Sequence, residues 1–162
     1  MISRSSPKKI DLVDNGVVKP GVLIRQNFSP DDYGDGKAQA LAKRINHIAP
    51  DISVEAYIAD AHAFIISNLP RFSDYDLVLD CTASPIFQMK LERDWVSCEI
   101  NSPRIVSMCL DDRAQHILAL SINRSAPAGI WDGYIRLKHR LCLEDQKELV
   151  NTFYSDPSDS AL

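Results

Sequence analysis

The sequence predicts an α/β protein with a mostly parallel sheet flanked by helices. Short apolar segments at residues 9–14, 52–58 and 77–80 have the length and composition of strands, and the segments between them have helical periodicity. The order strand, helix, strand, helix, strand is that of a βαβαβ arrangement. With 162 residues, 45% of them hydrophobic and 25% charged, we expect a single domain over residues 1–162 with a frayed tail at residues 155–162.

The first half of the chain supplies three strands and two helices. After the strand at residues 9–14, the segment NGVVKPG favours a loop over residues 15–36 with at most a short helical turn. Residues 52–58 alternate between apolar and polar, as expected for a strand, and a helix is expected over residues 61–69. The run at residues 77–79 is uninterrupted, as in a strand covered on both faces. Residues 37–48 predict an amphipathic helix, which Pro50 prevents from continuing, with an apolar face of Ala38, Leu41, Ala42, Ile45 and Ile48.

The second half predicts a helix, a pair of strands and a terminal helix. Residues 85–94 favour a helix with Pro85 in its first turn. The segments RIVSMCL and HILALSI are strands close enough to form a hairpin. We expect a loop over SAPAGIWDGY, residues 125–134, and a helix over residues 143–153 with Glu144 and Asp145 in its first turn.

Charge, cysteine spacing and hydropathy narrow the class of protein. A net charge of -4 and a pI near 5.5 argue against a general affinity for nucleic acid or anionic lipid. The four cysteines include no C-x-x-C pair, which favours a reducing compartment. The sequence shows neither a secretory signal nor a long apolar run, so we expect a cytoplasmic protein with no membrane or nucleic-acid partner.

Two carboxylates end predicted strands. Asp14 ends the first strand and Asp80 ends the third. In a parallel sheet, ligands bind beyond the carboxyl ends of the strands, where one carboxylate can accept hydrogen bonds from ribose hydroxyls and another can hold a divalent cation. The alternative is that each Asp caps the segment that follows it.

Cationic and polar residues between these strands favour a phosphate ligand. Arg25, Gln26 and Lys37 precede or begin the helix at residues 37–48, whose N-terminus also offers free N–H groups. Taken singly, Lys37 could be a solvent-exposed helix-start lysine, and Arg25 could pair with Asp31 or Asp32. Taken together, these residues favour a nucleotide.

The segment from residue 10 to residue 84 resembles the ThiF/MoeB/HesA-type adenylyltransferase superfamily, which includes the ubiquitin-activating enzymes. The resemblance is carried by the strand-end Asp14, the Arg-Gln pair, the helix start at Lys37, the INHIAPDISV junction and the DLVLDCT strand. It implies a Rossmann-like fold that uses ATP and Mg²⁺. It further implies that Asp14 binds the ribose, Arg25 and Lys37 contact the phosphates, Gln26 supports the phosphate loop and Asp80 holds Mg²⁺.

The activity implied by the resemblance is ATP-dependent adenylylation of the C-terminal carboxylate of a ubiquitin-like or sulfur-carrier protein. The family's first strand and glycine-rich turn have no counterpart before KKIDLVD, so the fold is expected to be truncated at its first βα unit. Gly16, Val22 and the Thr82-Ala83-Ser84 segment also depart from the family pattern. A partner, a second copy or an upstream segment could supply the missing unit, and we expect a homo- or heterodimer.

Two other functions stay open at this point. One is a catalytically inactive homologue that acts as a pairing or scaffold subunit. The other is an NAD-type domain, which Arg25 and Lys37 and the missing glycine turn disfavour.

Members of the superfamily that form a thioester use a cysteine downstream of the magnesium aspartate, on a loop that crosses the site. Cys142 is the best candidate, because the neighbouring Lys138, His139 and Arg140 would favour its thiolate. Cys81 and Cys109 are expected inside strands as small buried residues.

Overall fold

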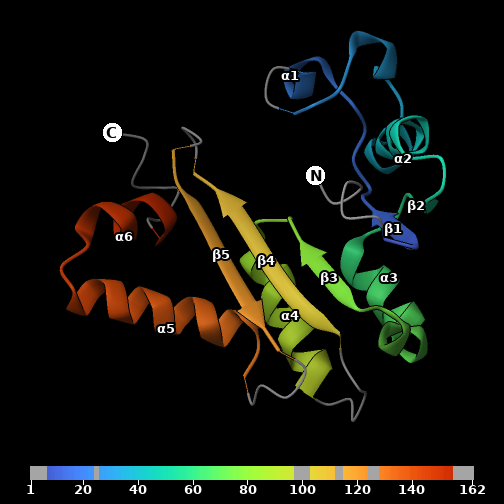
Figure 1. Cartoon of the computed structure of the whole chain (residues 1–162). Coiled ribbons are helices and arrows are strands. Elements are labelled where there is room, and N and C mark those ends of the chain that lie inside the picture. Colours follow the sequence, from blue (N-terminus) through green and yellow to red (C-terminus); the bar gives the residue numbers. More distant parts are fainter. Residues whose placement is uncertain (1–6, 24–25, 97–102, 112–114, 124–127, 155–162) are drawn as a thin grey trace. The chain divides into compact units, whose positions relative to one another are not determined.

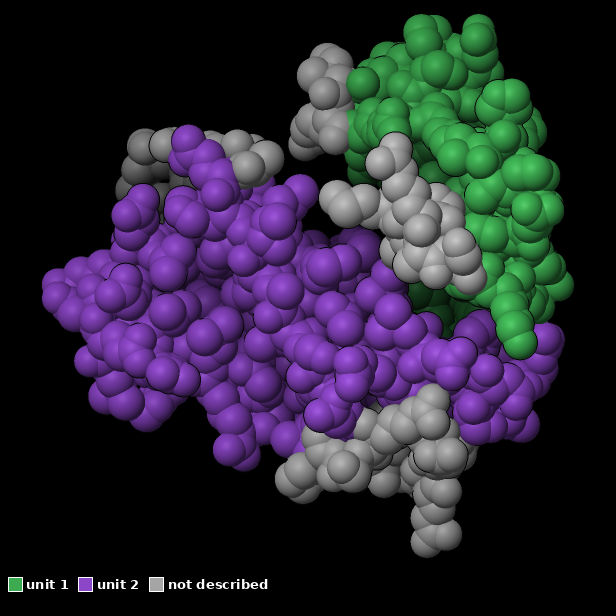
Figure 2. Space-filling view, in the orientation of Figure 1, with its two compact units in different colours: residues 1–67 green, residues 68–162 purple. Residues whose placement is uncertain are grey.

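The computed structural model describes residues 7–23, 26–96, 103–111, 115–123 and 128–154. It confirms the α/β class (Figure 1). The chain forms two compact units, residues 1–67 and residues 68–162 (Figure 2). None of the helices in the described part of the chain is both long and apolar enough to cross a bilayer.

The first unit is a two-stranded parallel sheet covered by helices. Strands β1 (Lys9–Val13) and β2 (Ser53–Tyr57) pair in parallel through the crossover helix α2 (Lys37–Ile48). The described residues of the connection from β1 to α2 include the short helix α1 (Pro20–Leu23) and the 3-10 turn η2 (Pro30–Asp32), one short element more than the sequence predicted. Helix α3 (Ala61–Asn68) follows β2.

Helix α2 has the predicted bounds, but its buried face differs from the expected one. Ala38 and Ala42 are buried as expected, together with Ala40, and the helix packs against β1 and β2. Leu41 and Ile48 are 40% and 61% exposed, so the apolar face predicted from the sequence is only partly buried. Alanine side chains are short, which lets the helix backbone approach the sheet while the longer side chains remain at its margin.

The second unit is a three-stranded mixed sheet with helices packed against it. After the 3-10 turn η3 (Leu69–Asp74), strand β3 (Leu77–Asp80) pairs in parallel with β4 (Arg104–Leu110) through helix α4 (Pro85–Val96). Strand β5 (Ile117–Ile122) pairs with β4 in antiparallel register, which confirms the predicted hairpin. Leu91, Ile105, Leu118 and Ile130 form much of the buried core.

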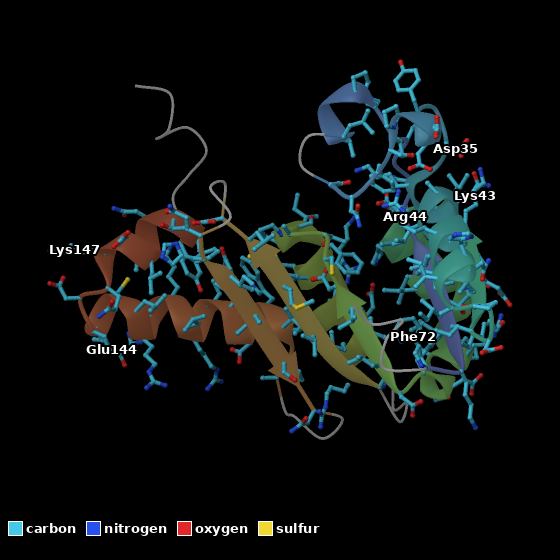
Figure 3. All side chains as sticks on the ribbon, turned by 45° about the horizontal axis from the view of Figure 1, so that its top comes forward. Asp35, Lys43, Arg44, Phe72, Glu144 and Lys147 are labelled. Carbon is cyan, nitrogen blue, oxygen red and sulfur yellow. The ribbon has the colours of Figure 1, made fainter. Side chains whose placement is uncertain are left out.

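The C-terminal region contains two helices where the sequence predicted a loop and one helix. Helix α5 (Ile130–Leu143) begins inside the segment expected to be a loop, and α6 (Lys147–Tyr154) follows a turn. Glu144 and Asp145 therefore lie between the helices and not in a first helical turn; Glu144 and Lys147 are labelled there in Figure 3. The predicted frayed tail at residues 155–162 lies outside the described residues.

Helix α5 begins where it does because of a contact from another helix. The Glu92 carboxylate on α4 accepts a hydrogen bond from the Asp132 N–H at 3.0 Å, so it satisfies one of the free donors in the first turn of α5. Gly129 is the N-cap residue, and a Cβ at this position would overlap the Glu92 side chain. The cap of α5 is thus built from residues far apart in the sequence.

Gly129→Ala is expected to lower the free energy of unfolding by about 1–2 kcal/mol, because the added methyl displaces Glu92 from its capping position. Glu92→Ala should have a similar effect. Since both changes remove the same contact, the double variant should be less destabilised than the sum of the two. Urea unfolding of the three variants measures this, and strictly additive effects would contradict the shared contact.

Candidate functional site

In the first unit, Asp14, Gly16 and Lys37 come together at the end of β1. The Gly16 N–H donates to Asp14 Oδ1 at 2.7 Å, and the Lys37 N–H donates to the Gly16 carbonyl at 2.9 Å. A Cβ at Gly16 would lie 2.9 Å from Asp14 Oδ1 and 3.2 Å from the Lys37 Cδ atom. The absence of a side chain at Gly16 therefore leaves room for the Lys37 stem beside the Asp14 carboxylate.

The chain before and after the segment that carries Arg25 and Gln26 is held together next to this cluster. Val18 is fully buried, its N–H donates to the Asp35 carbonyl at 2.9 Å, and its carbonyl accepts from the Gly34 N–H at 3.1 Å. Val17 and Gly36 form an isolated bridge beside these bonds. The side chain of Gln26 is exposed on the loop between these anchors, and Arg25 lies outside the described residues.

The acidic residues of the loop have partners on α2. Asp32 accepts from Arg44 at 3.1 Å, and Asp35 accepts from Lys43 at 2.7 Å; the residues of both pairs except Asp32 are labelled in Figure 3. Asp32 also accepts from the Ser29 N–H at 2.7 Å and from the Ser29 hydroxyl at 3.0 Å. These contacts tie the loop that carries Gln26 to the helix that begins at Lys37.

Asp32 makes the stability of the first unit depend on pH. Hydrogen bonds from the Ser29 N–H and hydroxyl, together with the Arg44 charge, lower the pKa of Asp32 below its ordinary value of 3.8. A lowered pKa stabilises the folded state above the unfolded-state pKa, and this contribution is lost as the pH falls through the folded-state pKa.

Asp32→Asn is therefore expected to lower the melting temperature at pH 7, whereas near pH 2 the variant and the parent protein should differ much less. Thermal unfolding followed by circular dichroism between pH 2 and pH 7 measures this. A melting-temperature difference that stays constant over this range would rule out the carboxylate charge as its cause.

In the second unit, Asp80 ends β3 as a buried carboxylate that is only 3% exposed. Its Oδ1 accepts from the Thr82 N–H at 2.9 Å and from the Thr82 hydroxyl at 2.7 Å. Its Oδ2 accepts from the Ser107 hydroxyl at 2.7 Å and from the Gln88 amide at 3.3 Å. Asp80 thus joins the end of β3 to both α4 and β4.

The turn after Asp80 leads directly into α4. Thr82 accepts a hydrogen bond from the Ser84 N–H at 3.2 Å, and the Ser84 hydroxyl accepts from the Phe87 N–H at 3.3 Å, where it caps α4. Ala83 has φ 50°, a left-handed conformation that costs an L-residue roughly 1–2 kcal/mol. The three residues that depart from the family pattern therefore form a defined turn.

Asp80 has the chemistry of a single protein ligand for Mg²⁺. Within the part of the chain that the structure describes, no three His, Cys, Asp or Glu side chains are grouped so that they could hold a metal ion. Mg²⁺ is commonly bound by one or two carboxylates, with waters and substrate phosphates completing its shell. A single strand-end carboxylate such as Asp80 fits this mode of binding.

The cysteines occupy places other than those expected. Cys81 follows β3 and is exposed, so its predicted burial in a strand is wrong. Cys109 does lie in β4 and is half-buried. Partial desolvation of each sulfur atom by the surrounding protein and the nearby Asp80 carboxylate raise the pKa of both thiols, which disfavours their thiolates. Cys142 is exposed in the last turn of α5, so it does not lie on a connecting loop.

Sequence reasoning missed Gln88 and Ser107, which bind Asp80 from α4 and β4. The sequence does mark Ser107 as unusual, because this polar residue interrupts the apolar strand RIVSMCL. It lies on the same side of the sheet as the buried Ile105. Gln88 gave no comparable signal, since a glutamine in an amphipathic helix is ordinary.

Parallel strands that end in carboxylates, with crossover helices between them, are typical of Rossmann-like nucleotide-binding domains. The ThiF family profile matches residues 1–111, and the chain belongs to the ThiF family.

Two curated relatives of this chain are an adenylyltransferase and a ubiquitin transferase-like protein. The adenylyltransferase and sulfurtransferase UBA4 of Kluyveromyces lactis is 34% identical over 82 residues, which cover 48% of this chain and 17% of that protein. The ATP-dependent ubiquitin transferase-like protein Cap2 of Enterobacter hormaechei is 25% identical over 118 residues, which cover 71% of this chain and 19% of that protein. The chain thus spans less than a fifth of these curated relatives.

Solved structures support the fold. Escherichia coli MccB, in a crystal structure with ATP, aligns with a TM-score of 0.57 and 19% identity over 68% of this chain and 32% of MccB. A further crystal structure of MccB, with the peptide MccA-N7isoASN, aligns with a TM-score of 0.56 and 20% identity over 67% of this chain and 31% of that chain. Both likenesses show that this chain shares the fold of the corresponding part of MccB.

Proposed function

We propose that this chain contributes the ribose, phosphate and metal contacts of a site that adenylylates the C-terminal carboxylate of a ubiquitin-like or sulfur-carrier protein. The observation that carries the proposal is the cluster at the end of β1, where the Asp14 carboxylate lies beside Gly16 and the Lys37 side chain. Membership of the ThiF family and the likeness to UBA4 support it.

Each side chain has a role that its chemistry allows. Asp14 accepts hydrogen bonds from the ribose hydroxyls, and Lys37 and Arg25 neutralise the phosphates. Gln26 supports the loop that carries Arg25. Asp80 would hold Mg²⁺, which supplies charge neutralisation at the triphosphate when bound. Adenylation needs alignment and charge neutralisation more than a nucleophile from the enzyme, because the attacking group is the carboxylate of the acceptor protein.

A thioester step is a separate proposal. Cys142 could accept the acyl group from the adenylate, with AMP as the leaving group, because its thiol is exposed. If so, Cys142→Ala should abolish a thiol-sensitive conjugate with the acceptor while leaving adenylation intact, and Cys109→Ala should preserve both.

The experiment that tests the adenylation proposal is calorimetric titration of the chain with ATP and Mg²⁺, compared with NAD, followed by ATP–pyrophosphate exchange with a ubiquitin-like sulfur-carrier protein. The proposal predicts binding of ATP in preference to NAD, and exchange that depends on the acceptor. Equal binding of both nucleotides, or a preference for NAD, would favour a dinucleotide-binding domain instead.

A pairing subunit without activity of its own is the second candidate. Among the described residues, β1 pairs only with β2, and β3 pairs only with β4. In the doubly wound order 3-2-1-4-5-6, the first strand lies between the second and the fourth. The second, third and fourth strands of this order would correspond to β1, β2 and β3. In that case the unpaired edge of β1 and the unpaired edge of β3 would each suit a parallel strand from a partner. ATP binding only in the presence of a second ThiF-type chain, as homo- or heterodimer, would favour this candidate.

A further inference from the structure

Three polar residues that are buried as whole residues form one network beside β3. They are Asp80, Gln88 and Ser107, which are 3%, 7% and 4% exposed and come from β3, α4 and β4 respectively. The Gln88 amide donates to the Ser107 hydroxyl at 2.9 Å, and both side chains donate to Asp80 Oδ2. Burying polar groups is unfavourable unless they bond to one another, and here all three do.

We propose that Ser107 and Gln88 are positioning residues that anchor Asp80 Oδ2, so that Oδ1 is the oxygen offered to the divalent cation. This inference rests on the proposed function, in which Asp80 holds Mg²⁺. Neither residue touches the nucleotide or the metal, and both act through the orientation of the carboxylate.

The two oxygens of Asp80 differ in the donors that hold them. A carboxylate has about four lone-pair sites, and the four hydrogen bonds to Asp80 use two on each oxygen. A cation must therefore replace one donor. The Thr82 hydroxyl belongs to an exposed residue and can rotate away from Oδ1, whereas the donors to Oδ2 are buried and come from different elements.

The hydrogen bonds to Asp80 Oδ2 are therefore fixed, whereas one hydrogen bond to Oδ1 can be exchanged for a cation. Residues that orient a metal ligand from its far side commonly change metal affinity by about 10- to 100-fold when they are removed. A purely structural network, which only holds α4 against the sheet, would affect the protein equally with and without metal. The metal dependence of nucleotide binding separates these two roles.

The test is the dissociation constant of ATP, measured by calorimetry on the full chain in Mg²⁺ and again in EDTA. The ratio of the two constants is the metal enhancement. Ser107→Ala should lower this enhancement by about 10-fold while leaving the affinity in EDTA unchanged. Ser107→Thr, which keeps the hydroxyl, should restore it. Ser121→Ala, at an exposed serine on β5, is the matched control and should behave as the parent protein.

Thr82→Val is not expected to lower the metal enhancement. Thr82→Val removes the exchangeable donor from Oδ1, so the metal enhancement should remain at least as large as in the parent protein. Gln88→Met should lower it in the same direction as Ser107→Ala but by less, because the Gln88 bond to Oδ2 is longer, 3.3 Å against 2.7 Å. This variant also tests the inference if Ser107→Ala does not fold.

A second measurement follows the metal directly. The free Mn²⁺ signal in electron paramagnetic resonance is followed as protein is added at a fixed concentration of ATP, and the Mn²⁺ bound by ATP alone, measured without protein, is subtracted. Ser107→Ala should leave more Mn²⁺ free than the parent protein does at the same concentrations of ATP and protein.

The outcomes distinguish the inference from the function on which it rests. If ATP binding by the parent protein is the same in Mg²⁺ and in EDTA, the metal role of Asp80 is rejected, and the positioning role with it. If the parent protein shows a metal enhancement that Asp80→Asn abolishes but Ser107→Ala and Gln88→Met retain, only the positioning role is overturned. An equal loss of affinity in both conditions would also overturn it.

Discussion

Asp80→Asn is expected to lower the rate of Mg²⁺-dependent ATP–pyrophosphate exchange by about 100-fold or more. The neutral amide has nearly the shape of the carboxylate but lacks the charge that would hold Mg²⁺ at the end of β3. Loss of the metal's contribution to charge stabilisation by roughly 3 kcal/mol corresponds to this factor. The measurement is exchange of labelled pyrophosphate into ATP with a ubiquitin-like sulfur-carrier protein as acceptor.

The matched control for this change is Asp74→Asn, at an exposed aspartate in the 3-10 turn before β3. It should retain the exchange rate of the parent protein. Because Asp80 also accepts four hydrogen bonds, circular dichroism must show that the Asp80→Asn protein is folded. A folded variant with an undiminished rate would reject Asp80 as the metal ligand.

Lys37→Met is expected to raise the dissociation constant of ATP by about 10- to 100-fold, since a hydrogen bond to a charged group contributes roughly 1.5–3 kcal/mol. Methionine keeps the apolar stem that lies beside Gly16 and removes the ammonium group. Calorimetric titration with ATP in the presence of Mg²⁺ measures the change.

Lys43→Met provides the control on the same helix. It changes the net charge by the same amount, but the Lys43 side chain is 71% exposed and pairs with Asp35 at the surface. Such pairs contribute little to stability. We expect ATP affinity to be unchanged in this variant. Equal losses in the two variants would indicate a general electrostatic effect and not a phosphate contact at Lys37.

Helix α2 and helix α5 show which parts of the fold the sequence could predict. The bounds of α2 follow from local features, because Gly36 precedes it, apolar residues recur along one face and Pro50 follows it. The start of α5 depends on Glu92, which lies in α4 and caps the Asp132 N–H. Local reading of the glycine-containing segment therefore favoured a loop, and only the tertiary contact explains the helix.

In the candidate site, too, some features follow from the local sequence and others depend on tertiary contacts. The chain order of Asp14, Lys37 and Asp80 and the strand-ending positions of the two aspartates could be read from the sequence, and the structure brings Asp14 and Lys37 together around Gly16. The buried partners of Asp80 could not be read in this way. Ser107 lies 27 positions after Asp80, and Gln88 lies 8 positions after Asp80. The three side chains come into contact only through the pairing of β3 with β4 and the packing of α4.

The proposal that Asp14, Lys37 and Asp80 serve one nucleotide is tested most directly by nuclear magnetic resonance. A ¹⁵N-labelled chain is titrated with Mg²⁺ and a non-hydrolysable ATP analogue, and the amide signals of Gly16, Lys37 and Thr82 are followed. The proposal predicts that all three shift along curves with one dissociation constant. Shifts confined to Gly16 and Lys37, or separate constants for these two and for Thr82, would contradict a shared nucleotide site.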